Sequence, residues 1–296
     1  MRSIALSRLH HFGVALLFGA TALSAAAATK PVADELRPKK LKLVWEEDFN
    51  TDGPLDPAHW DYEHGFVRNQ EVQWYQPQNA VCENGCLVIT AKKETVSNTA
   101  YDATSKDWHF NRKEAHYTSS SVMTKGRHWL HYGRMEVRAK IPVTDGSWPA
   151  IWCLGNKDVT GPWPACGEVD IMEFYTHDIL ANTAWSNEQG GAVWNAKHIP
   201  FTHFTERDSL WAEKFHTWRM DWDSLAIRIY LDDELLNETD LRRTSQRVGD
   251  FCRVENPFRT PQYLLLNLAL RASDGIDEKY FPLHYYIDYV RFYEWE

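Results

Sequence analysis

The sequence predicts an all-β protein built as a sandwich or barrel of antiparallel strands. Short runs alternate polar and apolar residues with period two, turn signals separate these runs, and helical periodicity over ten or more residues is scarce. Aromatic residues are also abundant, with Trp 14, Tyr 13 and Phe 13 making up 14% of the chain. Such an excess either fills a core or lines a groove that stacks on a flat ligand face, such as a sugar ring.

The chain begins with a pattern typical of a secretory signal peptide. Arg2 and Arg8 supply positive charge, an apolar run extends from Phe12 to Ser24, and the small residues Ala25–Ala28 offer a cleavage site. The apolar run is shorter than the roughly 20 residues that a membrane-spanning helix needs. We therefore expect residues 1–28 to be removed on export, and the mature protein to be secreted or periplasmic and not bound to a membrane.

The rest of the chain shows no internal repeat, low-complexity linker or composition break. We expect residues 29–39 to be a short leader and residues 40–296 to form a single domain, because about 250 residues of short strands suit one large sandwich or barrel. The formal net charge of -9 argues against a nucleic-acid partner, which would require a basic surface. A monomer is expected.

Four runs in chain order show the strand pattern most clearly. They are rich in β-branched and aromatic residues, which favour strands. An Asn84-Gly85 turn signal precedes the first of them. The runs are Leu87–Ala91, Arg134–Ile141, Trp222–Leu231 and Tyr285–Tyr293.

The five cysteines leave their pairing open. Cys82 and Cys86 flank the turn and could bridge a hairpin, while Cys153 and Cys166 could pair between neighbouring strands. With Cys252 the number is odd, so at least one thiol is free or bonds another molecule. The alternative is that all five are small buried hydrophobic residues. Because no CxxC, HExxH or Cys/His cluster occurs, we expect no catalytic metal and no organic cofactor.

An acidic cluster is the most informative feature. Glu168, Asp170 and Glu173 follow the spacing E-x-D-x-x-E, which also arises by chance on the charged face of a strand in an acidic protein. Strict alternation puts Glu168 and Asp170 on one face and sends Glu173 to the core side, where an unpaired carboxylate is unfavourable. A β-bulge at Ile171–Met172 would return Glu173 to the face of the other two acids, and bulges often re-aim side chains at active sites.

Convergence of the three acids predicts glycosidic chemistry. Four effective strand steps separate the backbones of Glu168 and Glu173 by roughly 13 Å. Side chains that lean together would reduce this to roughly 5 to 6 Å, the separation typical of a retaining glycosidase. One carboxylate would attack the anomeric carbon while the other protonates the leaving oxygen. Mutual repulsion should raise at least one pKa, and Asp170 would tune the coupling.

Eight motifs follow one another along nearly the whole chain after the leader. These motifs are Trp45–Asn50, Asn69–Tyr75, Asn84–Ala91, Thr124–Gly126, Tyr132–Pro142, Gly146–Gly155, Trp163–Phe174 and Ile287–Tyr293. With these motifs in the order of the family, the chain from about Leu43 to Tyr293 resembles glycoside hydrolase family 16, on its laminarinase and mixed-linkage β-glucanase branch.

The resemblance implies a β-jelly-roll sandwich of two antiparallel sheets with a concave substrate cleft. Residues 40–296 would be the catalytic domain of a secreted, endo-acting, retaining enzyme that hydrolyses β-1,3 or mixed β-1,3/1,4-glucans. By position, Glu168 would be the nucleophile, Glu173 the general acid/base and Asp170 the residue that assists the nucleophile. The order of the two glutamates comes from the resemblance alone.

Five residues are candidates for sugar binding. Trp148 and Trp152 are four apart and share one strand face, and Trp163 lies in the segment before Glu168. A core position is the alternative for these tryptophans. Asn69 lies near the family's sugar-binding Asn, and Asn267 lies in a late strand of the implied cleft, although a strand Asn also pairs with backbone.

The family often carries a structural calcium ion, and the resemblance implies its position. The ligands would lie near Asp48, the carbonyl of Gly85, and Asp288, since oxygen donors suit calcium. The alternative for the two acids is a solvated side chain or a turn cap.

Two departures from the family pattern bear on the substrate. Ser121 stands where this branch commonly has Arg in a sugar subsite, and Arg271 follows Asn267-Leu268-Ala269-Leu270 where paired Gly are usual. The same mechanism on another polysaccharide, a galactan such as agarose or a xyloglucan, is therefore the alternative. A sulfated galactan is disfavoured, because three carboxylates repel anions. A non-catalytic glucan-binding lectin would be expected to have lost one of the acids, and all three are present.

Overall fold

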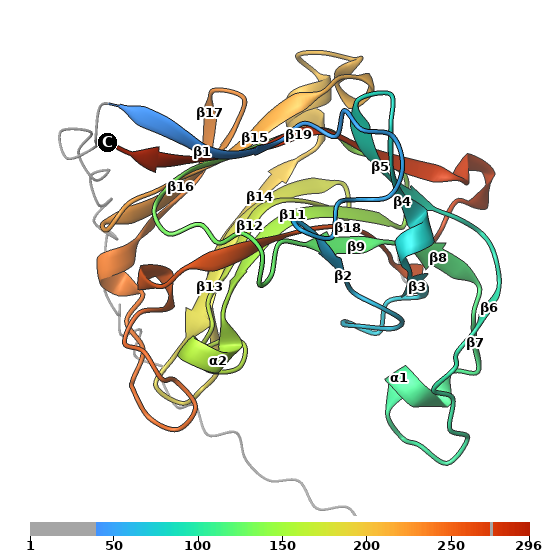
Figure 1. The fold of residues 1–296 in the computed structure, drawn as a ribbon, viewed down its shortest axis with the longest axis horizontal. Coiled ribbons are helices and arrows are strands. Elements are labelled where there is room, and N and C mark those ends of the chain that lie inside the picture. Colours follow the sequence, from blue (N-terminus) through green and yellow to red (C-terminus); the bar gives the residue numbers. More distant parts are fainter. Residues whose placement is uncertain (1–39, 273–274) are drawn as a thin grey trace, which may run out of the picture. The chain divides into compact units, whose positions relative to one another are not determined.

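The computed structural model describes residues 40–272 and 275–296, and two large antiparallel sheets form most of it (Figure 1). The predicted signal peptide and leader lie outside the described residues. Among the residues that the structure describes, none of the helices has the length and apolar character that crossing a bilayer requires.

The first sheet has eight strands. Its order is β17-β16-β15-β10-β19-β5-β4, and β1 also pairs with β19. The long strand β19 thus joins β10 on one side to both β1 and β5 on the other. The strands are β1 (Leu41–Glu47), β4 (Ala80–Glu83), β5 (Cys86–Ala91), β10 (Gly133–Lys140), β15 (His216–Trp222), β16 (Ala226–Leu231), β17 (Glu234–Asp240) and β19 (Leu283–Trp295).

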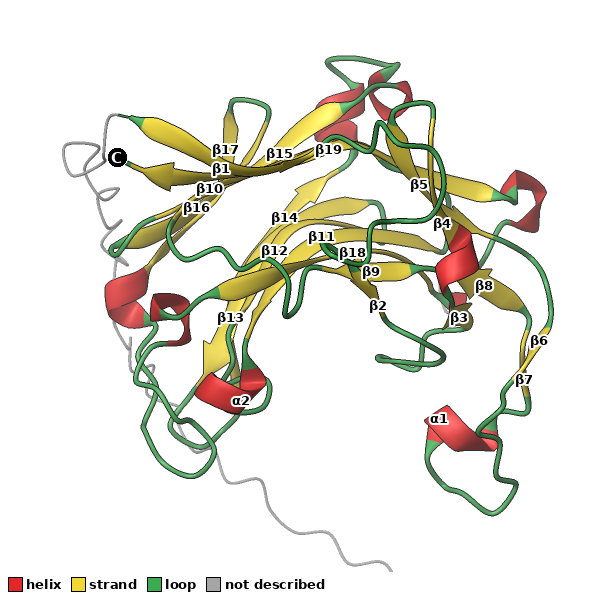
Figure 2. Ribbon diagram, viewed as in Figure 1, coloured by secondary structure: helices red, strands yellow, loops and turns green. Residues whose placement is uncertain are grey.

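The second sheet has seven strands in the order β14-β13-β12-β11-β18-β9-β2. It is curved, and its concave side faces away from the first sheet (Figure 2). The strands are β2 (Asp61–Tyr62), β9 (Ser121–Met123), β11 (Ser147–Gly155), β12 (Glu168–Tyr175), β13 (Asp178–Ser186), β14 (Ala192–Pro200) and β18 (Gln262–Leu270).

The remaining elements are short. Strand β3 (Gln73–Tyr75) pairs with β8 (Tyr117–Ser119), and β6 (Val96–Ser97) pairs with β7 (Glu114–Ala115). The α-helices are α1 (Trp108–Asn111), α2 (Lys157–Thr160) and α3 (Thr202–Thr205). The 3-10 turns are η2 (Pro77–Asn79), η3 (Trp211–Glu213), η4 (Leu241–Arg243), η5 (Pro257–Arg259) and η7 (Glu278–Tyr280).

The core lies between the two sheets and follows the period-two alternation. On β10, Met135 and Val137 are fully buried, and on β12 Val169 is fully buried. Trp218 and Trp222 are also among the largest fully buried side chains. Much of the aromatic excess therefore fills the core, and the all-β sandwich predicted from the sequence is confirmed.

One predicted strand proves to be two. The run Trp222–Leu231 contains the last residue of β15 and the whole of β16, with a turn between them. Asp223 closes this turn, because its side chain accepts hydrogen bonds from the backbone N–H groups of Leu225 (2.7 Å) and Ala226 (2.9 Å). An acceptor side chain of this kind favours a turn over a continuous strand.

All five cysteines are free thiols, so neither candidate disulfide is formed. In the β4–β5 hairpin, Cys82 pairs with Leu87 and Glu83 pairs with Cys86. Because neighbouring strand residues point to opposite faces, Cys82 and Cys86 lie on opposite sides of the sheet. The alternative of small buried residues describes four of the five, and Cys86 is half-buried.

Candidate active site

A cavity of about 960 Å³ lies over the concave side of the second sheet. It is lined by residues from β11, β12, β13, β14 and β18, together with the segment before β3. The structure brings together every acid and every sugar-binding candidate predicted from the sequence. These residues are Glu168, Asp170, Glu173, Trp148, Trp152, Trp163, Asn69 and Asn267.

A β-bulge in β12 makes this convergence possible. On the β11 side, Ile151 pairs with Met172 and Trp152 pairs with Asp170, which leaves Ile171 without an opposite residue. The pairing of β12 with β13 shifts between Asp170 and Glu173 as well. The extra residue returns Glu173 to the face of the other acids, as the spacing E-x-D-x-x-E predicted.

Glu168 is held by the tryptophan that precedes it in the chain. The indole Nε1 of Trp163 donates a hydrogen bond to Glu168 Oε2 at 2.6 Å. Burial raises the pKa of Glu168, while the Trp163 N–H and the positive charge of Arg68 act in the opposite direction. These two groups favour the ionised form that a nucleophile requires.

Asp170 lies between the two glutamates and is buried. Burial, followed by the charges of Glu173 and Glu168, raises the pKa of Asp170 well above its ordinary value. Its Oδ2 has no hydrogen-bond partner among the described residues, which is unfavourable for a charged oxygen and therefore favours the protonated form. A side-chain hydrogen bond between Asp170 and Glu168 raises the pKa of Asp170 further and lowers that of Glu168.

Glu173 is also held by tryptophan. Trp148 Nε1 donates a hydrogen bond to Glu173 Oε1 at 2.8 Å, and Asn182 Nδ2 donates one to Oε2 at 3.4 Å. Burial raises the pKa of Glu173 to about 7, and the negative charge of Glu168 contributes in the same direction. A carboxyl group with this pKa is suited to general acid and base catalysis near neutral pH.

Trp152 forms part of the cleft floor and is 8% exposed. Its indole Nε1 donates to Asn267 Oδ1 at 2.7 Å, and the guanidinium of Arg68 lies 4.9 Å from its ring centroid. Asn267 in turn donates to the hydroxyl of Tyr75 at 3.2 Å. Trp152 therefore has the properties of a core aromatic as well as a cleft position, and its stacking on sugar remains a prediction.

Trp148, Trp163 and Asn69 are more accessible. Trp163 is 49% exposed, and the half-buried Trp148 makes an edge contact with Tyr175. Asn69 is exposed, has a left-handed backbone with φ 55°, and donates to Glu71 Oε1 at 3.2 Å. Asn tolerates this conformation better than most residues.

The structure adds cleft residues that the pattern of the sequence did not single out. Arg68 forms an ion pair with Glu63, whose carboxylate also accepts a hydrogen bond from Ser121 at 2.6 Å. Ser121, which stands where the family usually has Arg, is thus linked through Glu63 to the guanidinium of Arg68. Glu71 is a buried fourth acid, and Trp194 lines the cleft from β14. The only signal for Arg68 in the sequence was its position directly before the motif that begins at Asn69.

Arg271, which the sequence marked as unusual, also lines the cleft. Its guanidinium lies 4.0 Å from the ring centroid of Tyr175 and 5.7 Å from that of Trp148. This cation is therefore positioned by aromatic faces beside the tryptophan that holds Glu173.

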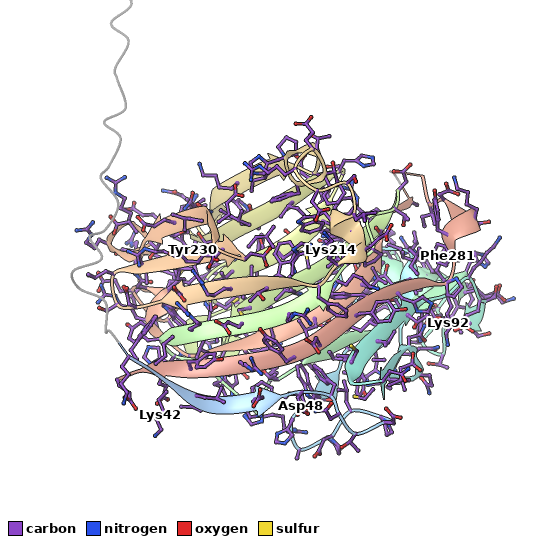
Figure 3. The ribbon with its side chains drawn as sticks, turned by 90° about the horizontal axis from the view of Figure 1, so that it is seen from above. Lys42, Asp48, Lys92, Lys214, Tyr230 and Phe281 are labelled. Carbon is purple, nitrogen blue, oxygen red and sulfur yellow. The ribbon has the colours of Figure 1, made fainter. Side chains whose placement is uncertain are left out.

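The residues expected to bind calcium have other partners in the structure. Asp48, labelled in Figure 3, lies directly after β1, and its Oδ2 accepts a hydrogen bond from Asn50 at 2.6 Å. Asp288 forms an ion pair with Arg138, and Gly85 occupies the β4–β5 turn. No group of three or more His, Cys, Asp or Glu side chains in the described part of the chain could hold a metal ion. Calcium remains a prediction, which the effect of EDTA on the melting temperature would test.

The geometry of the cleft defines the class of protein. Two glutamates lie on one strand face, and each accepts a hydrogen bond from a tryptophan N–H. The pKa of one of them, Glu173, is raised to about 7. This arrangement is typical of the active site of a glycoside hydrolase. The chain belongs to the glycosyl hydrolases family 16, whose family model matches residues 67–291.

Relatives and solved structures agree with this assignment. The chain is 31% identical over 276 residues to a beta-glucanase of Rhodothermus marinus, an alignment that covers 86% of this chain and 85% of the relative. The catalytic domain of an endo-1,3-beta-glucanase (laminarinase) from Thermotoga petrophila RKU-1 has a TM-score of 0.68 at 32% identity, covering 87% and 99% of the two chains. A solved structure from work on endo-acting O-glycanases, which prominent members of the human gut microbiota express to initiate mucin breakdown, has a TM-score of 0.76 at 34% identity, covering 88% and 92%.

Proposed function

We propose that the protein is a secreted or periplasmic, endo-acting, retaining β-glucanase that hydrolyses β-1,3 or mixed β-1,3/1,4-glucans. The observation that carries this proposal is the convergence of Glu168 and Glu173 on one face of β12, in a cleft lined by aromatic residues. The beta-glucanase and laminarinase relatives support a glucan as the substrate.

In this mechanism the carboxylate of Glu168 attacks the anomeric carbon. Glu173 gives its proton to the glycosidic oxygen, the bond between that oxygen and the anomeric carbon breaks, and a glycosyl ester of Glu168 forms. Glu173, now ionised, takes a proton from water, and the oxygen of that water displaces Glu168 from the anomeric carbon. Two inversions at the same carbon retain its configuration, and the second step restores both carboxyl groups.

The arrangement of protons supports these roles. Burial raises the pKa of Glu173 to about 7, so that much of it still carries a proton near neutral pH, whereas Trp163, Asp170 and Arg68 favour an ionised Glu168. Burial raises the pKa of both glutamates, and only around Glu168 do a cation and two hydrogen-bond partners oppose that effect, so we expect Glu168 to be the nucleophile and Glu173 the acid.

We expect kcat/KM to fall as the pH rises above about 7, because Glu173 has its pKa near 7 and must be protonated to act as the acid. Each further pH unit should lower kcat/KM about tenfold. A pH profile on polysaccharide measures this. An aryl glycoside whose leaving group needs no proton should lack the decline, and a flat polysaccharide profile up to pH 9 would contradict the role of Glu173.

A different glycan is the second candidate substrate. The structure from the O-glycanase work has the higher TM-score of the two solved structures described above. Arg68 and Arg271 also place two cations along the cleft. A galactose-containing chain cleaved by the same two glutamates is consistent with both observations, and it leaves the mechanism unchanged.

A panel of polysaccharides separates these candidates. We expect oligosaccharides of several lengths from laminarin and from mixed-linkage β-glucan, and little release from xyloglucan, agarose or mucin O-glycans. Product sizing over time shows whether cleavage is internal, and NMR of the first products shows whether the anomeric configuration is retained. Release from mucin O-glycans alone would replace the substrate and keep the mechanism, whereas inverted products would reject the mechanism.

A further inference from the structure

We propose that Trp194 forms, together with Trp163, an outer sugar-binding subsite on the Glu168 side of the cleft. This inference rests on the proposed action on a polysaccharide, and it adds a residue that the sequence pattern did not indicate. The ligand of this subsite is a further sugar ring of the polysaccharide whose scissile bond lies at the catalytic centre.

The register of the second sheet places Trp194 in line with Glu168. Trp194 on β14 pairs with Ala184 on β13, and Ala184 pairs with Glu168 on β12. Directly paired residues point to the same face of a sheet, and two strand spacings amount to roughly 10 Å. The indole is therefore presented on the cleft face, two strands away from the proposed nucleophile.

The neighbour of Trp194 confirms this orientation. Asn195 points the other way, toward the first sheet, where its Nδ2 donates to Thr239 Oγ1 at 2.8 Å and to the carbonyl of Glu238 at 2.9 Å. Because alternate residues of a strand face opposite sides, Trp194 faces away from the core. It is 45% exposed, whereas Trp218 and Trp222 are fully buried.

The two exposed indoles form one surface. The ring centroids of Trp163 and Trp194 are 6.3 Å apart and the ring planes are tilted by 51°, so the rings lie side by side and not stacked on each other. Both line the cavity that contains the three acids. The hydrogen bond from Trp163 to Glu168 orients the first ring, which lowers the entropic cost of binding.

Continuity with the cleft identifies the occupant. An exposed apolar patch at the end of a catalytic cavity is typical of a ligand site. Indole rings carry no charge and present flat faces, which suit the C–H face of a pyranose ring. A second protein would have to enter the same cavity that holds Glu168 and Glu173, whereas a polysaccharide passes from the catalytic centre onto these rings without a break.

The test is Trp194→Ala, with Tyr280→Ala as the matched control. Tyr280 is 51% exposed and belongs to η7, and it does not line the cleft. On the polysaccharide that the wild type cleaves best, Trp194→Ala should raise KM about tenfold with little change in kcat. With oligosaccharides of increasing length, kcat/KM of the wild type should rise at the first length that reaches the subsite. Trp194→Ala should not show this rise in kcat/KM.

Binding to an inactive enzyme separates this inference from the proposed function. In a Glu173→Gln background, adding Trp194→Ala should weaken oligosaccharide binding about tenfold, while Trp194→Phe should restore much of it. Equal behaviour of Trp194→Ala and Tyr280→Ala, or a change in self-association without a change in binding, would overturn the subsite. Binding that depends on Trp194 in a protein that cleaves no polysaccharide would retain the subsite and reject the proposed function.

Discussion

Replacing Glu168 or Glu173 with Gln is expected to lower the release of reducing sugar from polysaccharide by at least about 10²- to 10⁴-fold. Gln keeps the size of each side chain, but it can neither form the glycosyl ester nor supply a proton. Both residues are half-buried and hydrogen-bonded to tryptophan, so an isosteric change should preserve the fold. Near-normal activity in either variant would contradict the proposed mechanism.

A matched control is Glu234→Gln. Glu234 is on the first sheet, where it pairs with His203 and Arg207 at the surface, and exposed pairs of this kind contribute little to stability. This variant should retain full activity and an unchanged melting temperature.

Azide assigns the two roles. With an activated aryl glycoside, azide should replace the missing nucleophile in Glu168→Ala and give a glycosyl azide of inverted configuration. In Glu173→Ala it should react with the glycosyl ester and give the retained product. The opposite pattern would exchange the two assignments and leave the chemistry intact.

Replacing Asp170 with Ala is expected to lower kcat/KM about 10- to 100-fold. A hydrogen bond to a charged group is worth about 1.5–3 kcal/mol, and we expect a protonated Asp170 to donate such a bond to Glu168. Without it the pKa of Glu168 rises, so the acidic limb of the pH profile should move to higher pH. The pKa of Glu168 rises in this variant because the loss of a hydrogen-bond donor to the carboxylate disfavours its ionised form.

Asp170→Asn is the comparison that makes this prediction specific. The amide of Asn donates a hydrogen bond as a protonated carboxyl group does, so Asp170→Asn should retain clearly more activity than Asp170→Ala and shift the acidic limb less. If the two variants were equally impaired, the negative charge of Asp170 would be what matters, and the protonated state inferred from its buried Oδ2 would be wrong.

Local patterns predicted most of the framework. Alternation over Arg134–Ile141 and Tyr285–Tyr293 corresponds to β10 and β19, and the Asn84-Gly85 signal corresponds to a hairpin turn with positive φ at both residues. The bulge in β12 was also predictable, since three acids on one face require an extra residue between Asp170 and Glu173. Such features depend only on neighbours in the chain.

Other questions stayed open at the level of the sequence because they depend on partners that are distant in the chain. The hairpin register placed Cys82 and Cys86 on opposite faces, although both flank the turn in sequence. The role of Trp152 was undecided between core and cleft, and the structure gives it features of both, with Arg68 over its ring. The spacing of residues in the sequence does not reveal which side chains from distant parts of the chain come into contact.

The sequence by itself determined the all-β class and the acid cluster, because periodicity and residue spacing are local properties, and the family resemblance implied two sheets with a substrate cleft. Only the tertiary structure decided how the cleft is completed. Cross-strand register brings Trp194 into line with Glu168, and loop geometry brings Arg68 over Trp152. Burial between two strands, and not the acidic residues alone, raises the pKa of Glu173 to about 7. Long-range pairing and desolvation arise only when the chain is folded, and they give the acids of the cluster the different environments that the proposed mechanism requires.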